Sequence, residues 1–377
     1  MGKVYITSLH LLHGGVEMAI TLLANALVRR GFDVEILCIY NLGQPAYSVD
    51  EKVKITYLSD VHPNREEFYR AVKNKNIPLI VREGVYSVKV LSLKKKVMAE
   101  AIKRIDRGVI ISTRNEHSIL LSKYGRSGVE KIAQLHHDHK FEKQLMKDFR
   151  EKYSNIDYFV LLTDRLKDEV KVMMKDNTHT KCVVIPNFLA DMTEVMNSQR
   201  KRQVLAVGRL HEVKGFERLI KIWKRFDAKD GMVLKIIGDG QEKESLQNLI
   251  NKYCLQEKVI MTGELSHEKV MEEMCQSLCY VMTSYSEAFP FVLIEAMAGG
   301  LPVVAYDVRV GPAAIVQNGE SGFLIPDGNE ELFIDKLRIL CQDDKLREQM
   351  SKNAVQRSRE FSEDSVMKKW LEILKEK

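Results

Sequence analysis

Long apolar stretches and low-complexity tracts are missing from this 377-residue sequence. Its longest apolar stretches, such as residues 158–162 and 204–207, have the length of strands and fall far below the roughly 18–20 residues of a membrane-spanning helix. No Gly/Ser, Pro or Gln tract indicates disorder. The N-terminal residues enter a predicted strand at once, so we expect no signal peptide. These absences favour a folded protein without a membrane span.

Cysteine is scarce and scattered, and among the six cysteines only Cys275 and Cys279 lie close together. An i, i+4 pair on a helix could hold a metal ion, but no histidine or second cysteine pair lies nearby. Core packing is therefore the favoured interpretation of this pair. We expect reduced thiols and a cytoplasmic protein.

Complete nucleotide-binding signatures are missing as well. Gly14-Gly15 follows the first predicted strand and opens a helix over 16–30, where small residues and the helix dipole favour an anion. The third glycine and the acidic residue of a dinucleotide fingerprint are absent, and no Walker lysine motif occurs. Asp239 and Asp307 stand alone after strands, so no Asp-x-Asp metal motif is present. We expect neither a metal ion nor a cofactor.

Length and charge divide the chain into two parts. Single hydrophobic cores stop growing near about 250–300 residues, so 377 residues favour two domains. Residues 1–187 contain 31 Lys+Arg against 22 Asp+Glu, or +9, whereas residues 188–377 contain 27 against 30, or −3. The basic first part indicates an anionic partner for that part alone. Nucleic acid is disfavoured as the partner, because basic and aromatic residues do not alternate.

Strand and helix patterns alternate through both parts, which is typical of parallel sheets covered by helices. The polar stretch 187–202 is the expected linker, and an amphipathic helix is expected over 364–377. The expected strands of the first part are 3–8, 34–40, 77–82, 108–112, 132–136, 158–162 and 182–186, and those of the second part are 203–207, 233–237, 259–262, 278–283 and 302–306.

Two carboxylates, Glu287 and Glu295, stand eight residues apart where a strand passes through a loop into a helix. Pro290 and the start of that helix leave backbone N–H groups available for a phosphate. Carboxylates suit the hydroxyl groups of a sugar and a ribose, which donate hydrogen bonds. Two solvated surface glutamates are the structural alternative.

Two cations accompany another strand–turn–helix junction. Gly208-Arg209 follows the strand 203–207, and Lys214 stands five residues after the arginine, just before a helix. Such a pair can clamp a diphosphate, with each charge-assisted bond contributing roughly 1.5–3 kcal/mol. A basic surface turn would give the same pattern.

Taken together, these motifs resemble those of the family 4 retaining glycosyltransferases, and the resemblance spans nearly the whole chain in the correct order. It implies an α/β chain with the GT-B fold, in which two Rossmann-like, doubly wound parallel-sheet domains face each other across a cleft. The first domain, 1–188, would be the acceptor side, with a C-terminal helix at about 360–377 packing back on it. The second domain, 200–358, would bind a nucleotide sugar. The motifs are Gly14-Gly15-Val16-Glu17, Gly208-Arg209-Leu210 with Lys214-Gly215, Glu287 with Glu295, and Gly311-Pro312 followed by residues 318–326.

The resemblance also implies roles for individual residues. Arg209 and Lys214 would bind the donor diphosphate, Glu287 the donor sugar and Glu295 the ribose. Gly14 and Gly15 would let the first domain approach the phosphates, Gly208 belongs to the G-R-L motif, and the loop around Gly263 would face the base. The backbone that brackets sugar and phosphate would be that of Ala288, Phe289, Pro290, Phe291 and Val292.

His136 matches the family histidine near the donor sugar, where it would position the sugar and support charge. Zinc at His136-His137-Asp138-His139 is disfavoured, because separated ligands are lacking. The chain departs from the family pattern at Ala288, where glycine is usual, and at Ala314, where glutamate is common. The catalytic set implied is thus His136, Arg209, Lys214 and Glu287.

The expected reaction is metal-independent, retaining transfer of a hexose or N-acetylhexosamine, with a UDP sugar as donor. The acceptor would be a glycan, a glycolipid or an anionic cell-surface polymer. A non-catalytic nucleotide-sugar or polysaccharide-binding protein and a GT-B epimerase or phosphorylase remain as alternatives. A lysine-rich helix over 88–105 either packs on the first domain or rests on anionic lipid, which would place a cytoplasmic protein at the inner face of the plasma membrane.

Overall fold

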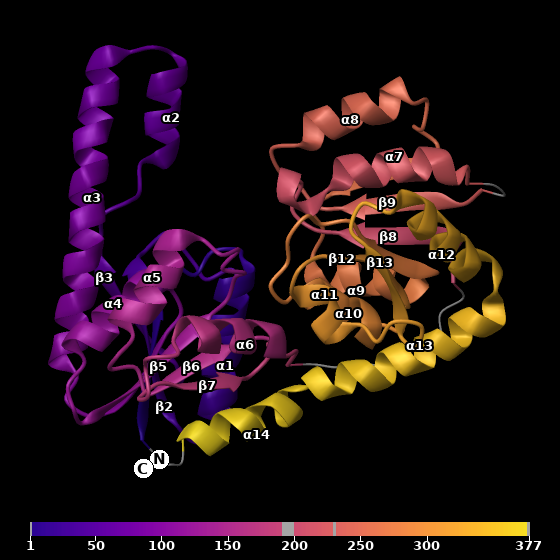
Figure 1. The fold of residues 1–377 in the computed structure, drawn as a ribbon. Helices are drawn as coiled ribbons and strands as arrows, with labels where there is room; N and C mark the ends of the chain where they lie inside the picture. The colour runs from indigo at the N-terminus through magenta and orange to yellow at the C-terminus, as the bar shows by residue number, and fades with distance from the viewer. Residues whose placement is uncertain (1, 191–199, 229–230, 375–377) are drawn as a thin grey trace. The chain divides into compact units, whose positions relative to one another are not determined.

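The computed structural model describes residues 2–190, 200–228 and 231–374 (Figure 1). The chain divides into two compact units. The first unit contains Met1–Leu162, Leu166–Ile185 and Trp370–Lys377, and the second contains Thr163–Arg165 and Pro186–Lys369. Of the expected linker 187–202, residues 191–199 lie outside the described part of the chain.

The first unit is built on a seven-stranded parallel sheet in the order β3-β2-β1-β4-β5-β6-β7. Its central strands are almost completely buried, which explains their continuous apolar sequences. The strands are β1 (Lys3–Ser8), β2 (Asp33–Tyr40), β3 (Lys54–Ser59), β4 (Gly108–Ser112), β5 (Val129–Leu135), β6 (Tyr158–Leu161) and β7 (Lys181–Val184). The helices are α1 (Gly15–Arg29), α2 (Arg65–Lys73), α3 (Ile77–Arg104), α4 (Asn115–Tyr124), α5 (Lys143–Lys152) and α6 (Asp164–Met173).

The second unit repeats this plan with a six-stranded parallel sheet in the order β10-β9-β8-β11-β12-β13. Its helix α7 buries an apolar face that includes Phe216 and Trp223 in the core of the unit. The strands are β8 (Gln203–Val207), β9 (Val233–Ile237), β10 (Val259–Gly263), β11 (Cys279–Met282), β12 (Val303–Asp307) and β13 (Gly322–Pro326). The helices are η1 (Glu212–Lys214), α7 (Phe216–Phe226), α8 (Lys243–Lys252), α9 (His267–Gln276), α10 (Phe291–Ala298), α11 (Gly311–Ile315), α12 (Glu330–Gln342), α13 (Asp344–Ser358), η2 (Arg359–Phe361) and α14 (Glu363–Leu374).

The expected architecture of two Rossmann-like parallel sheets is confirmed. The end of α14, from Trp370 onward, groups with the first unit, and Trp370 itself is buried. Within the described residues, no helix combines the length and the apolar character that a membrane span requires.

The strand expected over 77–82 is wrong, because these residues form the first turns of the long helix α3. The Asn76 side chain accepts a hydrogen bond from the Leu79 N–H at 3.2 Å, and Pro78 occupies the first turn, where its missing N–H costs nothing. The strand that follows β2 along the chain is instead β3. This strand lies at the edge of the sheet and is half-buried, so its sequence contains no continuous apolar run.

The second half of α3 packs on its own unit, with Val90, Met98 and Ile102 buried. Lys94 there forms an ion pair with Glu116 of α4 at 2.7 Å. The packing interpretation of the helix expected over 88–105 therefore holds for these positions.

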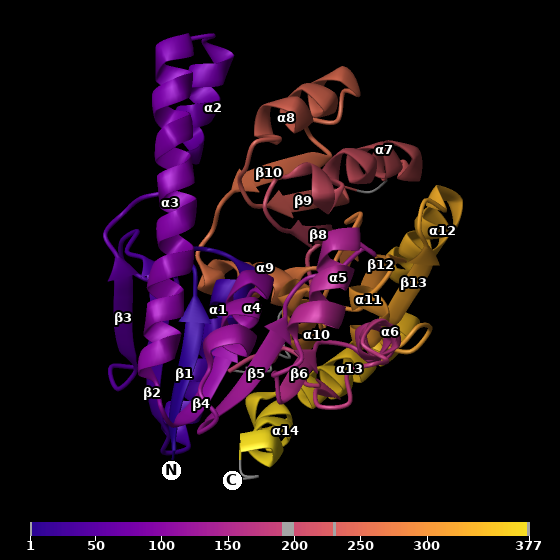
Figure 2. The same cartoon turned by 60° about the vertical axis from the view of Figure 1, so that its left-hand side comes forward.

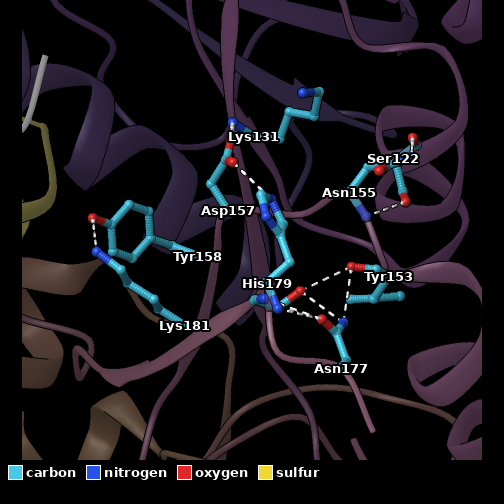
Figure 3. Close-up of polar contacts among 10 residues, drawn as sticks. Ser122, Lys131, Tyr153, Asn155, Asp157, Tyr158, Asn177, His179 and Lys181 are labelled. Atoms are coloured by element: carbon cyan, nitrogen blue, oxygen red, sulfur yellow. Dashed lines mark hydrogen bonds and ion pairs between the residues drawn. The ribbon is translucent and has the colours of Figure 1, made fainter. Parts of the chain in front are cut away.

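Polar contacts join the amino-terminal ends of β5, β6 and β7 (Figure 3). Asp157 accepts a hydrogen bond from the Lys131 N–H at 2.7 Å, and its other oxygen lies 3.0 Å from Nε2 of His179. The side chain of Asn177 donates to the Tyr153 carbonyl oxygen at 3.3 Å. These contacts lie at the opposite end of the strands from their carboxyl ends, so we assign them a structural role.

Replacing Asp157 with alanine should therefore lower the free energy of unfolding by about 1–2 kcal/mol, because a backbone N–H and a histidine lose their acceptor. Urea unfolding followed by circular dichroism measures this change. Asp176→Ala, which removes an exposed carboxylate close by, is the matched control and should change stability by less than about 0.5 kcal/mol. Equal effects of the two substitutions would contradict the structural role of Asp157.

Candidate active site

Each sheet has a point where consecutive connections run in opposite directions, between β1 and β4 in the first unit and between β8 and β11 in the second. Helices leave the sheet toward opposite faces at such a point, and ligands bind beyond the carboxyl ends of the strands there. Gly14 follows β1, Lys214 follows β8 and Glu287 follows β11. The predicted site residues thus gather where this topology provides binding sites.

In the second unit, Lys214 and Glu287 are in direct contact. Nζ of Lys214 donates to Oε1 of Glu287 at 2.7 Å, and both side chains are largely buried. An ammonium group has three N–H donors, so Lys214 can hold Glu287 and still bind a phosphate oxygen. The contact joins two groups that are 73 residues apart in the sequence.

The backbone at Gly215 explains why these two side chains meet. Gly215 has φ 65°, and a Cβ atom there would lie 2.0 Å from the carbonyl oxygen of Thr283. The Thr283 hydroxyl in turn donates to the Gly215 carbonyl oxygen at 2.9 Å. Only glycine allows this approach, so the loop after β8 is fixed against the loop after β11.

Arg218, on the first turns of α7, also holds the loop after β8 against the loop after β11; we call this contact between the two loops the joint. Its guanidinium donates to the carbonyl oxygens of Thr283 and Ser284, and it pairs with Asp327 at 2.7 Å. The rings of Tyr285 and Tyr306 lie 4.0 and 4.2 Å from its central carbon. Sequence reasoning missed Arg218, although its position four residues after Lys214 offered a signal.

Gly311 packs against the segment from Ala288 to Val292, which leads into α10. The Gly311 N–H donates to the carbonyl oxygen of Glu287 at 3.0 Å, and a Cβ atom at Gly311 would lie 3.0 Å from the carbonyl oxygen of Ala288. The side chains of Phe289, Pro290 and Phe291 are buried. This segment therefore offers a ligand mainly its backbone, at the start of α10.

Glu295 is a buried carboxylate on the second turn of α10. Nδ1 of His267 lies 3.9 Å from its Oε1. Burial raises the pKa of Glu295, and the nearby His267 opposes this shift. Such a carboxylate is well suited to hydroxyl donors supplied by a ligand.

Arg209 differs from Lys214 in being exposed, and no described residue forms a hydrogen bond or an ion pair with its side chain. The loop that carries it is nevertheless fixed. The Leu210 N–H donates to the Asp239 carbonyl oxygen at 2.9 Å, and a Cβ atom at Gly238 would lie 2.0 Å from the carbonyl oxygen of Gly208. Arg209 is thus a free cation on a rigid backbone.

The loop predicted to face a base ends β10. Gly263 has φ 76°, and its carbonyl oxygen accepts from the Gly238 N–H at 2.9 Å. A hollow of about 420 Å³ lies nearby along α8, and its lining includes Met261 of β10, Gly240 and Asn248. The hollow is separate from the Lys214–Glu287 pair, since neither of these two residues lines it.

In the first unit, Gly14 makes room for a buried carboxylate. A Cβ atom at Gly14 would lie 2.1 Å from Oε2 of Glu17, whose other oxygen accepts from Nη2 of Arg114 at 3.0 Å. Gly15 begins α1 directly after it. The glycine pair therefore serves a charged contact inside this unit, and Arg114, which follows β4, is a site residue that sequence reasoning missed.

His136 follows β5 in this unit. Both of its ring nitrogens are buried, and neither has a hydrogen-bond partner in the described part of the chain. Burial, together with the positive charges of His137 and Arg114, lowers the pKa of His136 to about 3. The imidazole is therefore neutral near pH 7, which fits the predicted positioning role better than charge support.

The neighbouring histidines behave differently. His137 is exposed, whereas His139 is buried and lies 2.9 Å from Glu169. Across the described residues, no group of three His, Cys, Asp or Glu side chains is arranged as metal ligands would be. Cys275 and Cys279 are both buried and neither forms a disulfide; one lies on α9 and the other on β11, so they do not share a helix.

The chain is similar to known proteins in both sequence and structure. The family model described as "Glycosyl transferases group 1" matches residues 191–357. The chain is 30% identical over 366 residues to the amylovoran biosynthesis glycosyltransferase AmsD of Erwinia amylovora, covering 96% of both chains. It is 29% identical over 374 residues to an exopolysaccharide phosphotransferase of Streptomyces coelicolor, covering 96% of this chain but only 39% of that protein. A structure of an S. aureus TarM variant with UDP superposes with a TM-score of 0.77 at 15% identity, covering 99% of this chain and all of that one.

The raised pKa of Glu295 predicts a pH-dependent stability. Because the folded state holds this proton more tightly than the unfolded state, ionisation destabilises the fold as the pH rises through the folded pKa. Glu295→Gln should remove this loss and raise Tm at pH 8 by about 2–4 °C, the effect of roughly 1 kcal/mol in a domain of this size. The gain should shrink toward pH 4.

Thermal unfolding at pH 4, 6 and 8 measures the difference. The exposed Glu272 of α9 supplies the control, and Glu272→Gln should leave the pH dependence of Tm unchanged. A Tm for Glu295→Gln that is lower than wild type at pH 8 would show that the buried charge stabilises the fold.

Proposed function

Since the chain belongs to the Glycosyl transferases group 1 family, we propose that it transfers a hexose or N-acetylhexosamine from a nucleotide diphosphate sugar, with UDP as the nucleotide. The proposed reaction retains the configuration of the sugar and needs no metal ion. The observation that carries the proposal is the contact between Lys214 and Glu287. The same unit also contains Arg209, whose side chain is unpaired among the described residues, and Glu295, whose carboxylate is buried.

Two cations suit the leaving group of this reaction. Cleavage of the bond between sugar and diphosphate leaves negative charge on the phosphate oxygens, and fixed positive groups stabilise that charge. Arg209 is free to make a bidentate contact, and Lys214 contributes its remaining N–H donors. In the proposed mechanism these residues and the backbone N–H groups at the start of α10 take the place of a metal ion.

Two carboxylates suit the hydroxyl groups of the donor. Glu287 retains a free oxygen beside the one that Lys214 occupies, and we assign it to the hydroxyls of the transferred sugar. Glu295 lacks a close donor among the described residues, and we assign it to the ribose. Hydroxyl donors would stabilise its ionised form and so offset the burial that raises its pKa.

For retention we propose displacement on one face of the sugar. The bond from the sugar carbon to the donor phosphate breaks while the acceptor hydroxyl bonds to that carbon, and the hydroxyl proton passes to the departing phosphate oxygen. This scheme requires no cationic histidine, in keeping with the neutral imidazole of His136, which we assign to positioning.

The proposed acceptor is a glycan, a lipid-linked glycan or an anionic cell-surface polymer. The Erwinia relative is named for amylovoran biosynthesis, the Streptomyces relative is named an exopolysaccharide phosphotransferase, and the TarM structure contains UDP. The excess of basic residues in positions 1–187 suits an anionic acceptor. We extend the proposal to a cytoplasmic location, peripheral at the inner face of the plasma membrane.

A panel of UDP, GDP and ADP sugars tests the donor. The ligand that binds the folded state should stabilise it by about 2.7 kcal/mol at a hundredfold excess over Kd, measured as a thermal shift. Release of free nucleotide without added acceptor, with and without EDTA, distinguishes an enzyme from a binding protein. Stabilisation by none of these sugars would overturn the proposed function, and loss of turnover in EDTA would overturn its metal independence.

Lys214→Ala should lower the rate of nucleotide release roughly 10- to 150-fold, because one charge-assisted contact to the leaving group is worth about 1.5–3 kcal/mol. Lys221→Ala, which removes an exposed lysine from α7, is the matched control. Both variants should unfold cooperatively in a thermal scan. A Lys214→Ala enzyme with wild-type turnover would contradict the assigned role.

A further inference from the structure

The helical hairpin formed by α2 and α3 bears an uncovered apolar face. Both views show α3 extending well beyond the sheet of its own unit, with α2 beside its outer half (Figures 1 and 2). Along this outer half, five large apolar side chains are between 52% and 71% exposed: Ile77, Val81, Val85, Val88 and Leu91. They fall within an arc of about 120° and extend over about 21 Å of helix. We call these five residues the α3 stripe.

Contacts on the opposite side of α3 fix the direction of the stripe. Glu83 is buried and accepts a hydrogen bond from the side chain of Asn64 at 2.7 Å. The hydroxyl of Ser87 donates to Asn64 at 2.9 Å, and that of Tyr86 donates to the His62 carbonyl oxygen at 3.2 Å. The hairpin is therefore held together on its inner side, and the stripe faces away from these contacts.

Basic residues border the α3 stripe. Residues 68–96 contain eight lysines and arginines and a single acid, Glu83, which is buried. Arg82, Lys89 and Lys96 recur every seven residues, so they line one edge of the stripe, and all three are exposed. The end of α2 adds Lys73 and the turn between the helices adds Lys75, and both are exposed.

We infer that the α3 stripe and its basic border are the surface by which this protein docks on an anionic phospholipid bilayer. Apolar side chains along one helical face insert at the boundary between headgroups and acyl chains, and flanking lysines and arginines attract anionic headgroups. The inference rests on the proposed function for the peripheral location and adds which surface makes the contact. The proposed lipid-contacting surface differs from the helix over 88–105 that the sequence suggested, because the apolar residues of that helix other than Val88 and Leu91 pack inward.

A second copy of the chain is the competing occupant. Ile77, Val81, Val88 and Leu91 match the spacing of a coiled-coil seam, but Gly84 interrupts that seam and no exposed acid borders it. Two copies would bring basic borders together without opposite charges to pair with them, which is unfavourable. The charge therefore favours anionic lipid over self-association.

Sedimentation with vesicles tests the inference on the full chain. Wild-type protein should sediment with vesicles of phosphatidylglycerol and phosphatidylcholine at low salt, and only weakly with pure phosphatidylcholine. Raising the salt concentration should weaken the binding. K73E/K89E/K96E should lower the partition coefficient about a hundredfold or more, because each basic residue near an anionic surface contributes about a fivefold factor. V81S/V85S/V88S should lower it at least about tenfold.

Matched controls separate docking from general changes of charge or polarity. K252E/K345E/K352E makes the same charge change on exposed residues of the second unit, and Val172→Ser removes an equally exposed valine from α6. Both should bind vesicles more tightly than the corresponding hairpin variants. Nucleotide release in solution should be unchanged in V81S/V85S/V88S, so failure of the proposed enzymatic function and failure of docking are observed separately.

Three results would overturn the inference. Wild-type protein could fail to bind the anionic vesicles at low salt. The hairpin variants could bind them as wild type does. Light scattering could show a dimer that V81S/V85S/V88S dissociates while vesicle binding is absent, in which case the stripe is an interface between two copies.

Discussion

The approach of two backbone segments at Gly215 and Thr283 determines the geometry of the candidate active site. β8 and β11 are neighbours in the sheet, so the loops that follow them leave from the same edge. A side chain at Gly215 would collide with the Thr283 carbonyl oxygen, and the Thr283 hydroxyl closes the joint from the other side. Lys214 and Glu287 lie on either side of this joint, which holds their charged groups 2.7 Å apart.

A joint made by backbone atoms has a consequence for binding. A ligand that recognises Lys214 and Glu287 finds both groups already placed, so little side-chain and loop freedom is lost on binding. Arg218 contributes to the same rigidity by holding the carbonyl oxygens of Thr283 and Ser284. Arg209 is the exception, because its exposed side chain must lose rotamer freedom when it binds a phosphate.

Much of this arrangement could be predicted from the sequence, because parallel sheets bring the ends of their strands to one edge. Arg209, Lys214 and Glu287 each follow a short apolar run and precede a helix, which was enough to predict that they share a site. The Lys214–Glu287 contact itself was not predicted, since the sequence does not show how loops 73 residues apart meet. The contact between Arg114 and Glu17 was missed for the same reason, as these two residues are 97 positions apart. The error at 77–82 has another cause, because a short apolar run fits a buried strand and a helix equally well.

The outer half of α3 also shows where local sequence and fold disagree. Valine is a weaker helix former than leucine or alanine, and an exposed valine gains no packing in return. Val81, Val85 and Val88 therefore stabilise neither the helix nor the core of their unit. The inner half of the same helix follows the usual pattern, with Val90, Met98 and Ile102 buried. Exposed apolar residues that favour neither the helix nor the core are expected where a protein binds a partner or a membrane. On α3 the departure coincides with a border of exposed lysines and arginines, and this coincidence is why we propose that its compensation lies in an apolar surface that carries negative charge.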